Sequence, residues 1–242
     1  MSEKPYYQDE WATLYCGDAL EIVPTLGTVD VLVTDPPYGI SYQSNKRTAT
    51  EQFAVLAGDD DLEVAEAVLA LAVPKIRRGR HLYVFGPVKD ILERLPVAAV
   101  TQLVWDKEIR GMGNLSLPWG ISHESIYFGV YEPSAANRRK GYGNLTARLR
   151  KNSVLRVQRI QALGVTRHPT EKPVPLLRDL IESSSASSEV VLDPFAGVGS
   201  TLVAATLEGR GSVGIETEER YCEVARSRLQ VATRLAEEMK AA

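Results

Sequence analysis

A short hydrophobic segment that runs into a glycine-rich loop constrains the fold of this chain more than any other feature. The pattern Val190-Val191-Leu192 is typical of a buried strand, and a helix is predicted to begin after the loop, at Ser200-Thr201. A second strand, 212–215, ends at the acid Glu216. This order of strand, loop, helix, strand and acid is typical of the nucleotide-binding half of a Rossmann-like sheet.

The composition of the loop indicates which ligand it holds. Its glycines let the backbone approach a ligand closely, and Glu216 is placed to accept hydrogen bonds from both hydroxyls of a ribose. Position 202 is leucine where a dinucleotide loop has its third glycine, and Asp193 would repel a pyrophosphate and attract an ammonium group. S-adenosylmethionine carries an amino group and no phosphate, so it fits better than NAD. Its carboxylate could face the helix start at Ser200-Thr201.

A second set of chemistry-bearing residues lies near the N-terminus. The apolar segment 29–34 predicts a buried parallel strand. It must stop at Asp35-Pro36-Pro37-Tyr38, because two prolines cannot continue a central ladder. The amino group of a nucleic-acid base is a poor nucleophile with two N–H donors. The Asp35 carboxylate and the Pro36 carbonyl can each accept one of them, which directs the nitrogen lone pair at the methyl group.

The other two residues of this segment complete the predicted chemistry. Pro37, like Pro36, fixes the backbone so that the carbonyl points into the site. Tyr38 can stack on the base, which has to be flipped out of the duplex. We therefore predict a direct methyl transfer that depends on orientation. The predicted catalytic residues are Asp35, Pro36, Pro37 and Tyr38.

These motifs together resemble the β-group of DNA amino-methyltransferases, in which the catalytic motif precedes the cofactor loop. Further segments are similar to that family: Gly17-Asp18, Trp105-Asp106-Lys107, His123-Glu124 and 168–173. The resemblance implies that Asp18 contacts the adenine of the cofactor and that the 168–173 segment lines its methionine end. The predicted cofactor-binding residues are Asp18, Asp35, His168, Lys172, Pro173, Asp193, Pro194, Phe195, Gly197, Gly199, Ser200, Thr201 and Glu216.

The rest of the pattern predicts an α/β fold, because strands alternate with helices. The resemblance specifies a Rossmann-like class I methyltransferase. Its sheet has seven mostly parallel strands with one antiparallel strand, and its motif order is circularly permuted. Such an order brings the two ends of the sequence together at one site. The 242 residues suit a single domain, 1–242, in which 41–60 and 110–167 are the candidate DNA-recognition insertions.

Positive charge is concentrated in one part of an otherwise acidic chain. The formal net charge is −3, yet residues 138–178 hold eleven Lys and Arg and a single acid, Glu171. A strip this basic indicates contact with a polyanion, so double-stranded DNA is the expected partner. Because the insertions are modest, a homodimer or a partner protein is left open. The predicted phosphate contacts are Arg138, Arg139, Lys140, Arg148, Arg150 and Lys151.

The cysteines and the apolar runs exclude several other classes of protein. Cys16 and Cys222 lie in neither a Pro-Cys nor a CxxC pair, so we expect no cytosine-C5 nucleophile and no structural zinc. No run approaches the length of a membrane span, and the N-terminus has no signal core, so we expect a cytoplasmic protein without a membrane partner. Trp105 and Trp119 are expected to be core or loop-anchoring residues rather than base-stacking groups.

The identity of the methylated base is less constrained than the chemistry. Asp35 favours adenine N6, since cytosine-N4 members of the family often have serine at that position. Cytosine N4 and an RNA amino group stay open as alternatives. A protein amide or a non-catalytic DNA-binding relic is less favoured. The sequence also leaves open the recognition site and whether a restriction enzyme accompanies the protein.

Overall fold

The computed structural model describes residues 4–37, 62–108, 118–138, 151–159 and 171–241. Its strands are β1 (Tyr7–Gln8), β2 (Ala12–Cys16), β3 (Val31–Thr34), β4 (His81–Phe85), β5 (Val97–Asp106), β6 (His123–Tyr131), β7 (Val154–Arg156), β8 (Val190–Asp193) and β9 (Gly211–Glu216). Its α-helices are α1 (Ala19–Ile22), α2 (Leu62–Ala72), α3 (Lys89–Arg94), α4 (Ala135–Arg138), α5 (Val174–Ser184), α6 (Ser200–Leu207) and α7 (Glu219–Ala241).

The strands of the described residues form one mixed sheet in the order β1-β2-β9-β8-β3-β4-β6-β5-β7. Seven of these strands, β2-β9-β8-β3-β4-β6-β5 in sheet order, match the predicted Rossmann-like sheet. Among these seven, β6 alone runs antiparallel to its neighbours. Two short edge strands that the sequence did not predict extend this core: β1 pairs antiparallel with β2, and β7 pairs parallel with β5. The predicted fold class is confirmed.

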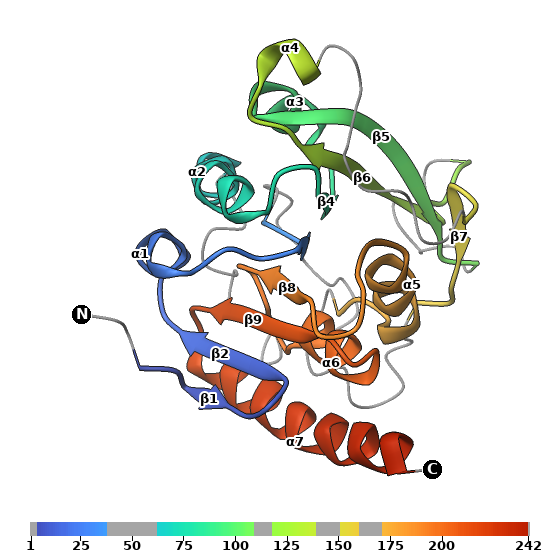
Figure 1. The fold of residues 1–242 in the computed structure, drawn as a ribbon. Coiled ribbons are helices and arrows are strands. Elements are labelled where there is room, and N and C mark those ends of the chain that lie inside the picture. The colour runs from blue at the N-terminus through green and yellow to red at the C-terminus, as the bar shows by residue number, and fades with distance from the viewer. Residues whose placement is uncertain (1–3, 38–61, 109–117, 139–150, 160–170, 242) are drawn as a thin grey trace, which may run out of the picture.

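Strands from the two ends of the chain lie side by side in this sheet. The C-terminal strands β8 and β9 lie between the N-terminal strands β2 and β3 (Figure 1). The predicted meeting of the two chain ends is therefore present in the topology. The description of this order as a circular permutation stays a prediction.

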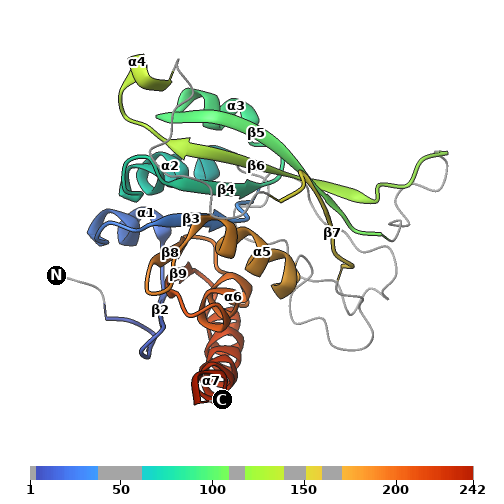
Figure 2. The same ribbon diagram turned by 45° about the vertical axis from the view of Figure 1, so that its right-hand side comes forward.

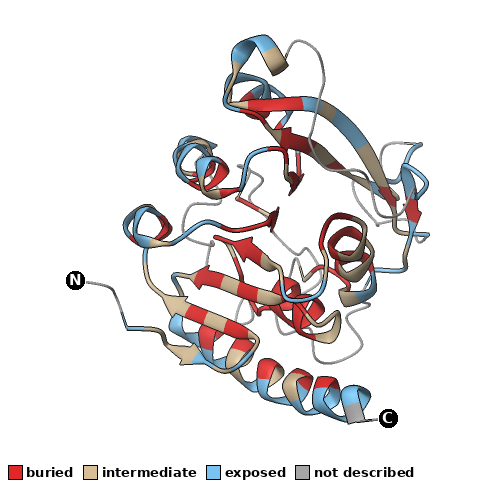
Figure 3. Cartoon of the chain, viewed as in Figure 1, coloured by how far each residue is buried: buried red, intermediate tan, exposed pale blue. Residues whose placement is uncertain are grey.

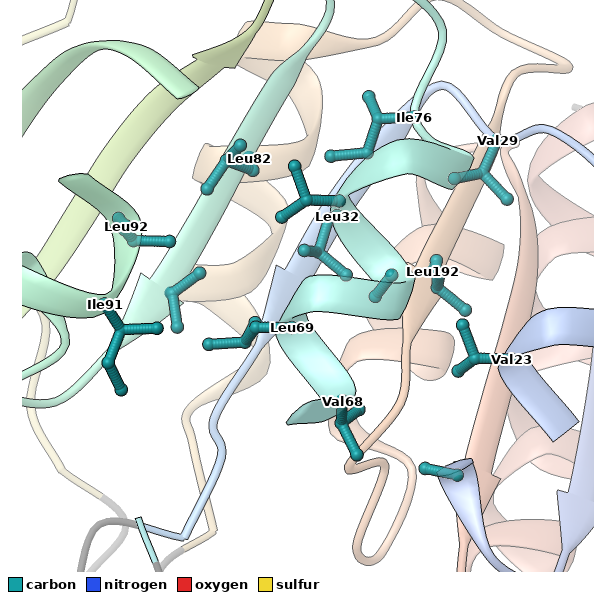
Figure 4. Packing of buried hydrophobic residues seen from close by; sticks show 14 of the residues in the cluster. Val23, Val29, Leu32, Val68, Leu69, Ile76, Leu82, Ile91, Leu92 and Leu192 are labelled. Atoms are coloured by element: carbon teal, nitrogen blue, oxygen red, sulfur yellow. The ribbon is translucent and has the colours of Figure 1, made fainter. Parts of the chain in front are cut away.

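Helices cover both faces of the sheet. α1, α2 and α3 lie on one side, whereas α5, α6 and α7 lie on the other (Figures 1 and 2). Leu69 of α2 packs with Leu32 of β3 and Leu82 of β4 in the core of the first side (Figure 4). β3 is buried along its whole length (Figure 3), which explains why its sequence is continuously apolar rather than alternating.

Two helices end earlier than their hydrophobic spacing predicts. The sequence predicts helices over 19–26 and 62–76, whereas the α-helices stop at Ile22 and Ala72, and each continues as a 3-10 turn, η1 (Val23–Thr25) and η2 (Val73–Lys75). Each turn contains a proline, which cannot donate the backbone hydrogen bond that a further α-helical turn requires. Among the described residues, no helix combines the length and the apolar character that crossing a membrane requires.

Candidate active site

Four acidic residues lie at one edge of the sheet. β2, β9, β8 and β3 are consecutive parallel neighbours, so their carboxyl ends meet on the same side. Asp18 follows β2, Glu216 ends β9, Asp193 ends β8 and Asp35 follows β3. The fold thus brings the predicted cofactor loop and the predicted catalytic segment together, although they are more than 150 residues apart in the sequence.

Asp193 ties the cofactor loop to the strand that carries the catalytic segment. Its side chain is 4% exposed, and its Oδ1 accepts hydrogen bonds from Oγ1 of Thr34 at 2.8 Å and from the backbone N–H of Phe195 at 3.1 Å. Burial raises the pKa of Asp193 to about 6, against the lowering effect of these hydrogen bonds. The carboxyl group is therefore held in one place by the neighbouring strand β3 and by its own loop, with Pro194 buried directly after it.

Glu216 fixes the other side of the loop. Its Oε2 accepts a hydrogen bond from the backbone N–H of Gly197 at 2.8 Å, and its Oε1 accepts one from the N–H of Glu218 at 2.9 Å. Burial raises the pKa of Glu216 as well. A carboxylate in this position is oriented by the backbone before any ligand arrives.

The two glycines of the loop have different reasons to be glycine. Both have a positive φ, +52° for Gly197 and +75° for Gly199. A Cβ on Gly199 would lie 2.9 Å from the Cβ of Ala225 in α7, so this glycine allows the close approach of a helix. A Cβ on Gly197 would meet nothing within 4 Å. The open side of Gly197 leaves room for a ligand beside Glu216 and Asp193, and these residues fit a nucleoside that carries an amino group.

The start of α6 is held by Arg228, a residue that the sequence did not single out. Arg228 of α7 donates to the carbonyl of Val198 at 2.7 Å and to Oγ of Ser200 at 3.0 Å. Its guanidinium also forms a 2.7 Å ion pair with Glu171. The segment before α5 and the helix α7 therefore both contact the end of the cofactor loop. Thr201 is buried in the same turn.

Asp35 lies at the end of a row of alternating charges. Nζ of Lys172 donates to its Oδ2 at 2.5 Å and lies 2.9 Å from Oε1 of Glu124. Nζ of Lys107 lies 2.9 Å from Oε2 of the same glutamate. The other oxygen of Asp35, Oδ1, is buried and has no hydrogen-bond partner in the described part of the chain. Because a buried acceptor without a partner is costly, this atom is available to an N–H donor.

The ammonium of Lys172 contacts the catalytic segment, which the family resemblance did not imply. A contact of Lys172 with the methionine end of a cofactor stays a prediction. Glu124 and Lys107 were noticed only as parts of family-like segments. Their opposite charges, each next to the end of a predicted strand, were the available signal. Spacing alone could not show that they meet.

The remaining described residues of the predicted cofactor and catalytic sets are placed by their local structure. Oδ1 of Asp18 accepts from the N–H of Leu20 at 2.8 Å and so caps α1. Pro173 is the residue before the first turn of α5 and is buried. Pro36 is buried and Pro37 half-buried directly after Asp35. The contacts of these residues with a ligand stay predictions.

Several predicted residues lie outside the described part of the chain: Tyr38, His168, Arg139, Lys140, Arg148, Arg150 and the insertion 41–60. The described basic residues have partners within the chain. Arg138 donates to the carbonyls of Glu132 and Pro133, both at 2.8 Å. Lys151 pairs with Asp179 at 2.7 Å and with Glu182 at 2.9 Å. Their use as phosphate contacts stays a prediction, which the two carboxylates beside Lys151 disfavour.

The two tryptophans behave differently. Trp105 is buried and its Nε1–H donates to the carbonyl of Val157 at 2.7 Å, so its predicted core role is confirmed. Trp119 is 86% exposed, and the prediction that it anchors a loop is wrong. Trp119 precedes His123, the residue at which the pairing of β6 with β5 begins. No strand of the described residues therefore pairs beside it. Ile121 beside it is 73% exposed.

A sheet of this topology, with acids at the strand ends and a glycine loop opening a helix, defines a Rossmann-like class I methyltransferase. A model of the N6_N4_Mtase family, described as DNA methylase, matches residues 29–227, and the chain belongs to this family. It is therefore a DNA methyltransferase of the type that modifies an exocyclic amino nitrogen.

Individual relatives agree with this assignment. The type II methyltransferase M.ScaI of Streptomyces caespitosus is 27% identical, over 94% of this chain and 84% of its own length. The type II methyltransferase M2.DpnII of Streptococcus pneumoniae is 25% identical, over 95% and 94%. Among solved structures, M1.HpyAVI in complex with SAM has a TM-score of 0.68 at 22% identity, over 90% of this chain and 98% of that one. PvuII DNA methyltransferase, described as cytosine-N4-specific, has a TM-score of 0.70 at 13% identity, over 97% and 94%.

Proposed function

We propose that this protein transfers a methyl group from S-adenosylmethionine to N6 of adenine within a specific sequence of double-stranded DNA. The family supports methylation of a DNA amino group, with S-adenosylmethionine as the cofactor. One observation carries the assignment of the catalytic residue. Among the described residues, Oδ1 of Asp35 is a buried acceptor without a hydrogen-bond partner, at the sheet edge where the cofactor loop begins.

The cofactor supplies a methyl group on a sulfonium, which needs a nitrogen lone pair directed at it. Asp35 would accept one N–H of the amino group through Oδ1, and the Pro36 carbonyl would accept the other. Two acceptors on one nitrogen hold it against rotation and against conjugation with the ring, so the rate gain comes from orientation. Glu216 would accept from the ribose hydroxyls, and the Asp193 carboxylate would attract the cofactor's ammonium group.

The choice of adenine rests on the identity of residue 35. Cytosine N4 has the same two N–H donors, so the acceptor geometry serves both bases equally. Aspartate at this position favours adenine by family resemblance, whereas a similar structure belongs to an enzyme described as cytosine-N4-specific. Cytosine N4 is therefore the second candidate, with the same mechanism.

The exposed end of the β5–β6 hairpin is the described surface best suited to contact DNA bases. Trp119 and Ile121 are both largely exposed. Ser122 follows Ile121 directly, and its carbonyl accepts a hydrogen bond from the backbone N–H of Lys107 at 2.8 Å. Lys107 belongs to the charged row that ends at Asp35, so the exposed end of the hairpin adjoins that row. An aromatic side chain can stack where a flipped base leaves a gap. We assign base stacking in the duplex to this tip.

The catalytic assignment is tested by Asp35→Ala with tritiated methyl donor and unmethylated genomic DNA. We expect transfer to fall by at least about 100-fold, because one of two orienting contacts is lost. Cofactor binding, measured by calorimetry, should persist. Asp90→Ala, at an exposed position in α3, is the matched control and should retain full activity. Loss of cofactor binding in Asp35→Ala would instead make Asp35 structural and contradict the proposal.

A further inference from the structure

The row of charges that ends at Asp35 extends beyond the residues assigned to catalysis. It consists of Asp35, Lys172, Glu124 and Lys107, and we call it the ion-pair row. Its members come from the ends of β3, β5 and β6 and from the segment before α5. Two acids and two lysines alternate, with successive contacts of 2.5, 2.9 and 2.9 Å.

The ion-pair row lies mostly inside the protein. The side chains of Lys172 and Glu124 are 7% and 14% exposed. The Lys172 ammonium also lies 5.1 Å from the centre of the Phe85 ring, and that of Lys107 lies 4.9 Å from the centre of the Trp105 ring. Burying charges is costly and breaking a buried pair leaves an uncompensated charge. The four groups together are electrically neutral, which lets them share this interior.

The ion-pair row gives the two oxygens of Asp35 different surroundings. Oδ2 is held by Lys172, and Lys172 is itself held from the other side by Glu124. Oδ1 has no partner within the described chain. A lysine that contacted Asp35 alone could rotate toward either oxygen, whereas a lysine bound between two carboxylates is fixed on one.

We propose that Lys172 and Glu124 are positioning residues for methyl transfer: Lys172 holds Asp35 as a carboxylate through Oδ2, Glu124 fixes Lys172 in that position, and Oδ1 is left to accept from the amino group of the base. This inference rests on the proposed function, since it explains how the assigned catalytic acid is kept competent. It gives Lys172 a role toward the substrate side of the site, distinct from the cofactor contact that the family resemblance implied. Glu124 acts only through Lys172.

Opposite charges around Asp35 determine its ionisation. Burial raises the pKa of Asp35, and the negative charge of Glu124 raises it further, whereas Lys172 and the more distant Lys107 lower it. From the neighbouring strand β8, Asp193 is the other acid close enough to interact with Asp35. Removing Lys172 must therefore raise the pKa of Asp35, and removing the charge of Glu124 must lower it. A merely structural role would produce no such pair of opposite effects.

The ionisation of Asp35 can be observed without any reaction. We would label the protein with carboxyl-13C aspartate, assign the Asp35 resonance by its loss in Asp35→Asn, and titrate wild type, Lys172→Met and Glu124→Gln. The inflection should move up by at least about one pH unit in Lys172→Met and down in Glu124→Gln. Glu132→Gln removes a buried glutamate that pairs with Arg78 at the other end of β6, and it should leave the inflection in place. If Lys172→Met does not fold, Lys172→Gln replaces it.

Kinetics then connect the titration to the reaction. The acid limb of the kcat profile should move in the same directions, so that the rate of Lys172→Met falls about 10-fold relative to wild type on the acid side of both inflections and recovers at higher pH. The KM for S-adenosylmethionine should stay unchanged. A raised KM with an unmoved pH profile would show that Lys172 binds the cofactor carboxylate and would overturn the inference. An unmoved Asp35 titration in both variants would overturn it whatever the activity. The expected titration shifts without methyl transfer by the wild-type protein would instead overturn the proposed function.

Discussion

The cofactor half and the substrate half of the candidate site differ in how their acids are used. In the cofactor half, Asp193 and Glu216 accept hydrogen bonds from the backbone or hydroxyl groups of neighbouring segments. In the substrate half, Asp35 is held by a lysine on one oxygen, and its other oxygen has no partner in the described chain. In the first half, the protein itself supplies hydrogen bonds to both acids. In the second half, Oδ1 of Asp35 is left for a bound ligand.

This difference predicts that amino-acid substitutions in the two halves have different effects. Backbone and hydroxyl donors of neighbouring segments orient Glu216 and Asp193, so these acids serve as a rigid frame for a ligand. Asp35 depends on side chains from three other segments, and its charge state depends on their charges. Substitutions in the first half should therefore alter stability and cofactor affinity, and those in the second should alter the rate and its pH dependence.

The largest expected effect on stability belongs to Asp193→Asn. The pKa of Asp193 is raised from 3.8 to about 6 in the folded protein, so the ionised form destabilises the fold. Its stabilising contribution is present below pH 4 and is lost as the pH rises through about 6. Relative to the variant, wild type should lose about 2–3 kcal/mol of unfolding free energy between pH 4 and pH 7. Urea unfolding at both pH values measures this, and a constant difference would show that Asp193 is not so perturbed.

Glu216→Gln should weaken cofactor binding without changing the rate at saturation. The amide keeps one acceptor for the Gly197 N–H but loses the charge that strengthens the hydrogen bonds with ribose. Such hydrogen bonds contribute about 1.5–3 kcal/mol, so we expect a loss of affinity on the order of 10-fold to 100-fold. Calorimetric titration with S-adenosylmethionine is the measurement. Unchanged affinity would remove Glu216 from the ribose site.

The two loop glycines give a matched pair of variants with separable effects. Gly199→Ala combines left-handed strain with a contact of 2.9 Å to Ala225 and should cost about 2–3 kcal/mol of stability. Gly197→Ala has the strain alone, about 1–2 kcal/mol. Gly197→Ala should nevertheless weaken cofactor binding more, because its methyl group enters the open space beside Glu216. Equal cofactor affinities in folded samples would contradict the placement of the ligand at Gly197.

The smallest expected effect concerns the tip of the β5–β6 hairpin. Trp119→Ala should leave the free energy of unfolding unchanged, because the side chain is exposed. It should weaken DNA binding by roughly 1 kcal/mol, the lower end of what base stacking contributes. Val154→Ala, an exposed apolar residue on β7, is the control. If both variants bind DNA like wild type, this tip does not contact the duplex.

The sequence predicted the frame of the molecule because that frame depends on local patterns. Continuous apolar runs located β3, β4 and β8, and the acids that follow strands predicted which residues meet at the sheet edge. The edge strand β7 was missed, since three residues, Val154–Arg156, carry too little pattern. Prolines 24 and 74 ended two helices early, which the apolar spacing did not reveal.

Side-chain partners were predicted less well than positions. The Lys172 ammonium lies at the end of a long flexible side chain, so its contact with Asp35 depends on the position of Glu124, which comes from another strand. Arg228 reaches the start of α6 from the terminal helix in the same way. Trp119 was expected to be a core or loop-anchoring residue, whereas its exposure depends on the strand pairing that ends beside it.

Identification of the methylated nucleoside tests the central claim most directly. Purified protein is incubated with labelled S-adenosylmethionine and unmethylated genomic DNA, and the DNA is digested and analysed by mass spectrometry. We predict that the label is recovered as N6-methyladenine and that Asp35→Ala yields at least about 100-fold less of it. Label in N4-methylcytosine would keep the mechanism and contradict the choice of base. A cofactor-bound protein that labels no nucleoside in this DNA would contradict the account as a whole.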